Sequence, residues 1–408
     1  MASDQGLPAV ESLFLEALRY GIAGAPVPWT EPPELSAQKA LAHLARAQVV
    51  QPLIVEALSA CPAMSDSPVL DVMKRETRAL VLRQARRTAE FLLLLRQLDS
   101  RGLRPVILKG AICRDLYPQP EQRPSTDEDL LIDPEELPTW DRALLDCGLQ
   151  RLDPDVSLEG ADELAYVDPE RELYLELHMQ PIVSLSRACT DCNLALEGAL
   201  ARRVQLHLYG ETLDTLHPTD HLLYLLCHAY KHLLYGGVGI RQLCDICLFA
   251  RRYAGELDWA ALRSACESLK IQTLSAAFFR FGERRLAIPG PEAFADLAPD
   301  EEPLVRDCLT GGLYGANDPD RVHSNALTLD AADADRQGRR RRGLARALFP
   351  GVQTMSARYP YLQKRPWLLP AAWVQRLGRY LAEKGAPGET LRIGEERVAL
   401  LRQYGVVR

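Results

Sequence analysis

Two aspartates that stand two residues apart, Asp127 and Asp129, are the residues of this sequence best suited to chemistry. The segment TDEDLLID reads as a strand, and side chains at i and i+2 of a strand project from the same face. Both carboxylates can therefore bind one hard cation, while Glu128 points the other way. In phosphoryl or nucleotidyl transfer, such a pair holds one or two Mg²⁺ ions that neutralise a triphosphate and activate the attacking oxygen. An acidic strand end also produces a D-x-D pair by chance.

The segments before and after the pair give it a context. PVILKG, about twenty residues earlier, reads as a short apolar strand that ends in Lys109 and Gly110. RELYLELHM, about fifty residues later, alternates leucines with polar residues. Alternation of this kind predicts a strand with one apolar face, and the other face carries Glu172, Tyr174, Glu176 and His178.

These strands belong to a segment that differs in character from the rest of the chain. Apolar residues recur at three and four over residues 1–98, which predicts a helical region. Residues 99–216 read as an α/β core, with further strands in ELAYVDP, VQLHLYG and ETLDTL and an amphipathic helix that begins after Asp133. Helices resume over 217–335, with Thr219 as N-cap of the first, and 336–408 forms a basic helical segment. The expected fold class is α+β, a small mixed-sheet core flanked by helical regions.

Three motifs together resemble a known family. VILKGA at residues 106–111, RPSTDEDLLID at 123–133 and ELH at 176–178 are similar to the uncharacterised nucleotidyltransferases, a branch of the polymerase-beta-like superfamily. The resemblance continues through LLYLLCHAYKHL, IRQLCDI and LFPGVQTMSARYPYLQKRPWLLPAAWVQRLGRYL, and so covers roughly residues 85–382. The first 85 residues match by helical character only.

The resemblance implies a role for each residue that matches a motif. Asp127 and Asp129 become ligands of Mg²⁺ or Mn²⁺, and Glu176 becomes the third carboxylate, either as general base toward the acceptor hydroxyl or as a further metal ligand. Lys109 and Gly110 occupy the turn where related enzymes have a Gly-Ser that contacts the phosphates of the NTP donor. The lysine then supplies positive charge to the nucleotide.

Other charged residues have two readings each. Arg123 either binds the nucleotide or pairs with Glu128 or another acid. Lys231 shares one side of a predicted helix with His228 and His232, where it would face the carboxylates and contact the triphosphate. The two histidines do not predict a zinc site, because no third ligand is evident. The simplest interpretation of Arg241 and Asp245, four apart on the next helix, is an ion pair.

The ten cysteines are more consistent with buried, reduced thiols than with disulfides, because MASDQGLPAV lacks the features of a secretory signal. Two C-x-x-C pairs are about fifty residues apart, too far for a zinc ribbon, and the second lies in an apolar helix. Packing is therefore the expected role of Cys189, Cys192, Cys244 and Cys247.

Charge is unevenly distributed along the chain. The net charge of −7 argues against general affinity for nucleic acid. Residues 336–408 nevertheless contain sixteen Lys or Arg against four Asp or Glu. RRRR at 339–342 reads as a solvated loop, with capture of an anionic acceptor as the alternative, and 317–343 as an exposed connection. No apolar run is long enough for a membrane span, so a cytoplasmic location without membrane contact is expected.

The combined prediction is a metal-dependent nucleotidyltransferase that moves a nucleoside monophosphate from an NTP to a hydroxyl of a small molecule or peptide. One alternative is phosphotransfer to a peptide or natural-product intermediate through the same site. Another is a non-catalytic protein that binds a nucleotide or a partner. The sequence leaves the donor base, the acceptor and the oligomeric state open.

Overall fold

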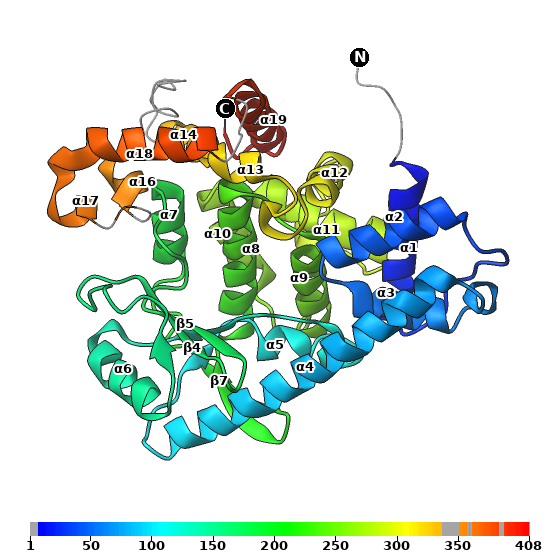
Figure 1. Cartoon of the computed structure of the whole chain (residues 1–408), viewed down its shortest axis with the longest axis horizontal. Coiled ribbons are helices and arrows are strands. Elements are labelled where there is room, and N and C mark those ends of the chain that lie inside the picture. The colour runs from blue at the N-terminus through cyan, green and yellow to red at the C-terminus, as the bar shows by residue number, and fades with distance from the viewer. Residues whose placement is uncertain (1–6, 337–350, 357–358, 360, 383–386, 408) are drawn as a thin grey trace.

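A seven-stranded mixed sheet with helices packed around it forms the centre of the computed structural model (Figure 1). The structure describes residues 7–336, 351–356, 359, 361–382 and 387–407. Helices precede and follow the sheet along the chain, and the predicted α+β class is confirmed. The division into four regions at 98, 216 and 335 stays a prediction. None of the described helices combines the length and the apolar character that crossing a membrane requires.

The N-terminal region consists of four helices: α1 (Ala9–Ala23), α2 (Leu35–Ala47), α3 (Gln51–Ser59) and α4 (Pro68–Asp99). Helices α2 and α3 are separated by a break at Val49, whose φ is 54°. Ser67 caps α4, because its side chain accepts a hydrogen bond from the backbone N–H of Leu70. This 32-residue helix runs from the N-terminal helices to the sheet (Figure 1). It therefore connects the two parts of the molecule.

The sheet has the strand order β3-β4-β5-β2-β1-β7-β6. Strand β2 pairs in parallel with β5 and antiparallel with β1, and β1 pairs in parallel with β7. In the β2–β5 pair, Asp129 lies opposite Glu176. The strands span Val106–Ile107 (β1), Glu128–Leu131 (β2), Gln150–Arg151 (β3), Glu163–Asp168 (β4), Leu173–His178 (β5), Val204–Leu208 (β6) and Glu211–Thr215 (β7).

The apolar face of β5 fixes how the strand is oriented. Leu173, Leu175 and Leu177 are buried in the core, whereas Glu176 is only half-buried. A shift of one residue in register would turn the leucines outward and Glu176 into the core, so burial of the leucines specifies the register. The predicted alternation along RELYLELHM is thus observed.

The helices between and after the strands are α5 (Ala111–Arg114), α6 (Leu137–Asp146), α7 (Arg187–Ala195), α8 (Pro218–Tyr235), α9 (Ile240–Arg252), α10 (Trp259–Ser268), α11 (Gln272–Leu286), α12 (Glu302–Gly311), α13 (Pro319–His323), α14 (Asn325–Arg336), α16 (Val352–Ser356), α17 (Tyr361–Lys364), α18 (Leu369–Ala382) and α19 (Pro387–Gln403). Helices α8, α9 and α10 lie on one side of the sheet (Figure 1). They therefore face the strand residues that point to that side.

Two sequence predictions for this region are wrong. The segment expected to be an exposed connection forms α13 and α14, and α14 packs on α8 and α19 because it buries Ala326, Leu329 and Ala332 along one side. The N-cap of α8 is His217 rather than Thr219, whose hydroxyl instead accepts the N–H of Asp258. The RRRR run at 339–342 lies outside the described residues.

One buried amide connects helices that are far apart in the sequence. Gln48, which is fully buried after α2, donates from Nε2 to the carbonyl of Cys308 at 2.7 Å. Its Oε1 accepts the backbone N–H of Ile240, at the start of α9, at 2.8 Å. The N-terminal helices and the helices after the sheet therefore satisfy one another's polar groups.

A buried histidine joins α8 to the sheet. His221 Nδ1 lies 3.1 Å from the hydroxyl of Thr215 on β7, and that hydroxyl donates to the carbonyl of Ile107 on β1. Burial lowers the pKa of His221 from 6.5 to about 4, although a backbone contact with Leu108 opposes the shift. His221 is therefore neutral in the folded protein at neutral pH.

This pKa shift predicts acid sensitivity. The unfolded chain takes up the proton first as the pH falls, so the free energy of unfolding should decrease between pH 6.5 and 4. His221 alone should contribute about 3 kcal/mol to that decrease. Urea denaturation of wild type and His221→Gln across this range measures it. The exposed His43→Gln should retain the wild-type slope, and a His221→Gln slope equal to wild type would contradict the assignment.

Candidate active site

Asp129 is the most buried acid of the predicted pair, with 1% of its surface exposed. Its Oδ1 lies 2.8 Å from Lys109 Nζ and 3.1 Å from His178 Nε2. Its Oδ2 is buried and has no hydrogen-bond partner among the described residues. Burial would raise the pKa of Asp129, but the charges of Lys109 and His178 outweigh burial and lower it. Asp129 is therefore ionised and keeps one acceptor oxygen free.

Lys109 joins the two aspartates, because its Nζ also lies 3.4 Å from Asp127 Oδ2. Burial disfavours the ammonium form, but the charges of Asp129 and Asp127 outweigh burial and raise the pKa of Lys109 well above its usual value. Asp127, just before β2, is only half-buried. The predicted residues Lys109, Asp127 and Asp129 thus form one ionic cluster.

Glu176 joins this cluster through His178. The Nε2 of His178 lies 3.6 Å from Glu176 Oε2, and its Nδ1 lies 3.4 Å from Glu163 Oε2 on β4. Burial opposes the charged imidazolium, but hydrogen bonds with Asp129 and Glu176 raise the pKa of His178 to about 9. His178 is therefore protonated at neutral pH and acts as a counter-ion that holds the acids close together.

Glu128 lies on the opposite face of β2, as the alternation predicts. Its Oε1 pairs with Arg114 at 2.5 Å, and its Oε2 accepts the backbone N–H of Ala111 at 3.0 Å. Gly110, between Lys109 and Ala111, has a φ of 51°, and a Cβ there would lie 1.9 Å from Glu128 Oε2. Gly110 is thus required by the close approach of the turn to Glu128.

Lys231 lies on α8, among the charges of the cluster. Its pKa is lowered by burial and by the charge of Lys109, while Glu163, Asp129 and Glu176 act in the opposite direction. His228 and His232 lie beside it, with their Nε2 atoms 3.1 Å apart, and burial lowers the pKa of both well below the usual value. Lys231 therefore lies within range of the charges of the carboxylates, beside two neutral histidines on α8.

Arg123 does not belong to this cluster. It is buried and donates two hydrogen bonds to Asp245 on α9, at 2.8 and 2.6 Å, and Asp245 also accepts from Tyr117. Arg241, the predicted partner of Asp245, instead donates to the carbonyl of Pro124. The expected Arg241–Asp245 pair is therefore wrong, since the bidentate guanidinium of Arg123 occupies both carboxylate oxygens of Asp245.

Within the described ranges, the group of residues that offers three close metal-ligating atoms is Asp129, Glu176 and His178, with atoms within 4.8 Å of one another. All ten cysteines are buried and free, as expected from the sequence. The two C-x-x-C pairs lie on different helices, α7 and α9.

The sequence matches the family described as uncharacterised nucleotidyltransferases over residues 35–286. The chain belongs to this family. The match begins within the N-terminal helices, earlier than the resemblance in the motifs indicates, and ends with α11. No curated protein and no solved structure matches the chain. Membership of the nucleotidyltransferase family supports a general role in nucleotidyl transfer.

The sequence analysis does not predict two residues that support the carboxylates. Arg114 is fully buried against Glu128, on the face of β2 opposite the ionic cluster. Glu163 contacts His178 from β4, and only the pairing of β4 with β5 brings it there, opposite His178. Such a contact depends on strand register, which the sequence motifs do not contain.

The close approach at Gly110 gives a mutational prediction. Gly110→Ala should lower the free energy of unfolding by more than about 2 kcal/mol, because the Cβ clashes with Glu128 and the backbone conformation is strained. Gly102→Ala is the matched control, since Gly102 has a φ of 76° but open space around it, and should cost about 1 kcal/mol. Equal losses in urea denaturation would contradict the close approach.

The Arg123–Asp245 pair gives a second prediction. Asp245→Asn should lower the free energy of unfolding by about 3–5 kcal/mol, because it leaves the buried guanidinium of Arg123 without a counter-charge. Asp146→Asn, which breaks an exposed pair with Arg101, should cost less than about 1 kcal/mol. Denaturation midpoints measure both changes. A small loss for Asp245→Asn would instead favour a substrate-binding role for Arg123.

Proposed function

We propose that this nucleotidyltransferase transfers a nucleoside monophosphate from an NTP to a hydroxyl of a small molecule or peptide, with Mg²⁺ or Mn²⁺ as cofactor and pyrophosphate as leaving group. The observation that carries the proposal is the pairing of Asp129 with Glu176 on adjacent parallel strands, together with the unpartnered, buried Oδ2 of Asp129. A buried carboxylate oxygen without a donor is an acceptor that a cation satisfies.

The donor set fits a hard cation. Asp127, Asp129 and Glu176 offer carboxylate oxygens, which Mg²⁺ prefers. His178 lies 3.1 Å from Asp129 Oδ1 and 3.6 Å from Glu176 Oε2, and in the metal-free protein these acids raise its pKa to about 9. The set of carboxylate oxygens, without a thiolate, favours Mg²⁺ over Zn²⁺ at the site. The bound ion supplies charge neutralisation for the triphosphate and for the leaving pyrophosphate.

The remaining groups act on the substrates. Lys109, where β1 meets the following turn, and Lys231, on α8, neutralise phosphate oxygens as the donor enters. Gly110 allows the backbone of this turn to come close to the phosphates. With the charge of the aspartates neutralised by a bound cation, the ammonium of Lys109 would be available to the triphosphate. Glu176, half-buried on β5, accepts the proton of the acceptor hydroxyl during attack.

A thermal-shift screen with ATP, GTP, CTP and UTP tests this proposal. A donor nucleotide with Mg²⁺ at about 100 times its Kd should raise the Tm by roughly 3–5 °C, because it binds only the folded state. EDTA or Asp127→Asn should abolish the shift, each read against the same protein without nucleotide. Asp155→Asn, which removes an exposed charge elsewhere, should retain it.

The product separates this reaction from its rivals. Mass spectrometry of the acceptor should show an added nucleoside monophosphate, whereas an added phosphate alone would identify a phosphotransferase. Full activity in the double variant Asp127→Asn, Asp129→Asn would overturn the assignment of the carboxylates.

A further inference from the structure

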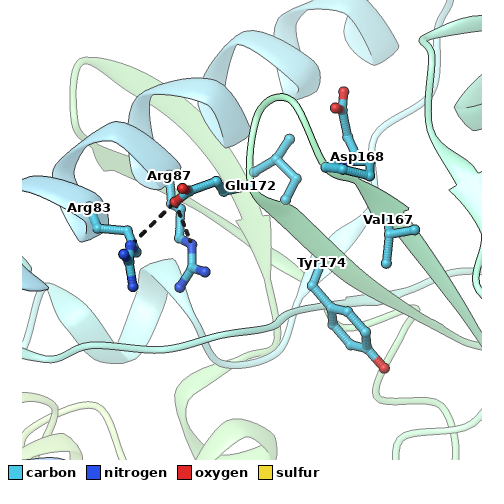
Figure 2. Close-up of a pocket in the computed structure, with 8 residues that line it drawn as sticks. Arg83, Arg87, Val167, Asp168, Glu172 and Tyr174 are labelled. Carbon is cyan, nitrogen blue, oxygen red and sulfur yellow. Dashed lines mark ion pairs between the residues drawn. The ribbon is translucent and has the colours of Figure 1, made fainter.

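A pocket of about 480 Å³ lies between α4 and the β4–β5 hairpin, outside the carboxylate cluster (Figure 2). Helix α4 contributes Arg83 and Arg87, which are one helical turn apart and therefore project from the same side. The hairpin contributes Glu172 and Tyr174. Figure 2 shows both guanidinium groups and the tyrosine ring directed to the same side of the hairpin. The pocket is thus lined by two cations and one aromatic side chain.

A single carboxylate serves both arginines. Glu172 Oε2 lies 3.5 Å from Arg83 Nε and 3.9 Å from Arg87 Nε, in contacts that are too long for strong hydrogen bonds. Glu172 has a φ of 55°, which is uncommon for a residue with a side chain. The guanidinium groups therefore retain donors that an entering oxyanion can use, and Glu172 occupies part of their site.

The other acid at the pocket is already engaged. Asp168 accepts the backbone N–H groups of Glu170 and Arg171 and pairs with the Arg171 side chain at 3.5 Å. Arg171 is itself shared with Glu90, at 3.8 Å. The guanidinium groups of Arg83 and Arg87 therefore face one carboxylate, that of Glu172, and are the charged donors of the pocket. Positive charge with planar, bidentate donors is the chemistry that recognises phosphate and carboxylate groups.

Tyr174 and Arg87 both place the pocket near the carboxylate cluster. Tyr174 stands two residues before Glu176 on β5, and burial together with the charges of Glu176 and Glu163 raises its pKa. Arg87 donates to the carbonyl of Ser125, two residues before Asp127. The pocket lies on the β4–β5 side of β2, whereas Lys109 follows β1 on the other side. Donor phosphates near Lys109 and a ligand near Arg83 would therefore approach the aspartates from opposite sides.

We propose that this pocket, called here the arginine pocket, binds an oxyanion of the acceptor substrate, a phosphate or a carboxylate, and that the ligand displaces Glu172 from Arg83 and Arg87. The assignment rests on the proposed function, because it requires an acceptor hydroxyl at Glu176. Glu176 lies three residues beyond Leu173, where β5 begins, which spans about 10 Å, and Glu172 lies in the turn just before Leu173. The acceptor therefore has its anionic group on the order of 10 Å from the reacting hydroxyl, a separation suited to a peptide or a comparably extended molecule.

Inorganic phosphate is the probe for the first test, by isothermal titration calorimetry of the full chain after divalent cations have been removed on a chelating resin. Without a divalent cation the carboxylate cluster repels phosphate, and the variants of the arginine pocket show how much of the measured binding belongs to it. Arg83→Gln should weaken phosphate binding about tenfold, because it removes charge-assisted hydrogen bonds. Glu172→Gln should strengthen binding several-fold, because the competing carboxylate is gone. A purely structural role for Glu172 predicts no such gain.

The matched control is Arg78→Gln, which removes an exposed charge from the same helix outside the pocket. It should leave the phosphate affinity within about twofold of wild type. An equal loss in Arg78→Gln and Arg83→Gln, or no phosphate binding in wild type and Glu172→Gln, would overturn the proposal. Arg83 is preferred to Arg87 for substitution because its side chain is 54% exposed, so the variant should fold.

Two further measurements define the ligand. Acetate is the second probe. If acetate binds, the site also accepts carboxylates; if only phosphate binds, the anionic group of the acceptor is a phosphate. The Mg²⁺-dependent stabilisation by nucleotide should persist in Arg83→Gln. Its loss would mean that the pocket binds the donor nucleotide, and would overturn the acceptor assignment. If wild type binds phosphate but shows no stabilisation by any nucleotide, the proposed function would be contradicted, whereas the oxyanion site would still be supported.

Discussion

Two consecutive buried acids on β2, Glu128 and Asp129, impose the constraint on which the centre of this fold depends. Ionised carboxylates are not stable inside a protein unless they are paired and hydrogen-bonded. Because neighbours on a strand point to opposite faces, each acid needs its own partners. Arg114 supplies them on one face, and Lys109 with His178 on the other. The arrangement of the sheet follows from satisfying both.

The turn after β1 meets this requirement within six residues. Lys109 reaches over one face of β2, the backbone at Gly110 and Ala111 comes close to Glu128, and Arg114 completes the opposite face. The segment that begins with VILKGA therefore supplies the positive charges and the backbone donor that neutralise the acids of TDEDLLID. Lys109 in this turn neutralises Asp127 and Asp129 when no substrate is bound.

Much of this could be predicted from local patterns. The period-2 alternation predicts that Asp129 and Glu176 lie on polar faces, and the apolar strands make their pairing in one sheet the natural outcome. Contacts that depend on tertiary approach could not be predicted. Arg123 and Asp245 form a hydrogen-bonded pair although they are 122 residues apart in the sequence, and no local sequence pattern predicts such a pair. The arginine pocket was hidden for the same reason, because a helix with Arg83 and Arg87 reads as a packing helix until the hairpin is placed against it.

The buried amide of Gln48 has a consequence for how the chain reaches its native state. Its two partners lie 192 and 260 residues further along the sequence. Contacts of such separation slow folding, since the loop must close before the contact stabilises it. At typical rates of synthesis, the segment with Cys308 follows Gln48 by on the order of 10–50 s. During that interval the amide of Gln48 lacks its partners, and the surface of the N-terminal helices that packs on the later helices is uncovered. Co-translational folding of this protein therefore ends only after the helices that follow the sheet have been synthesised.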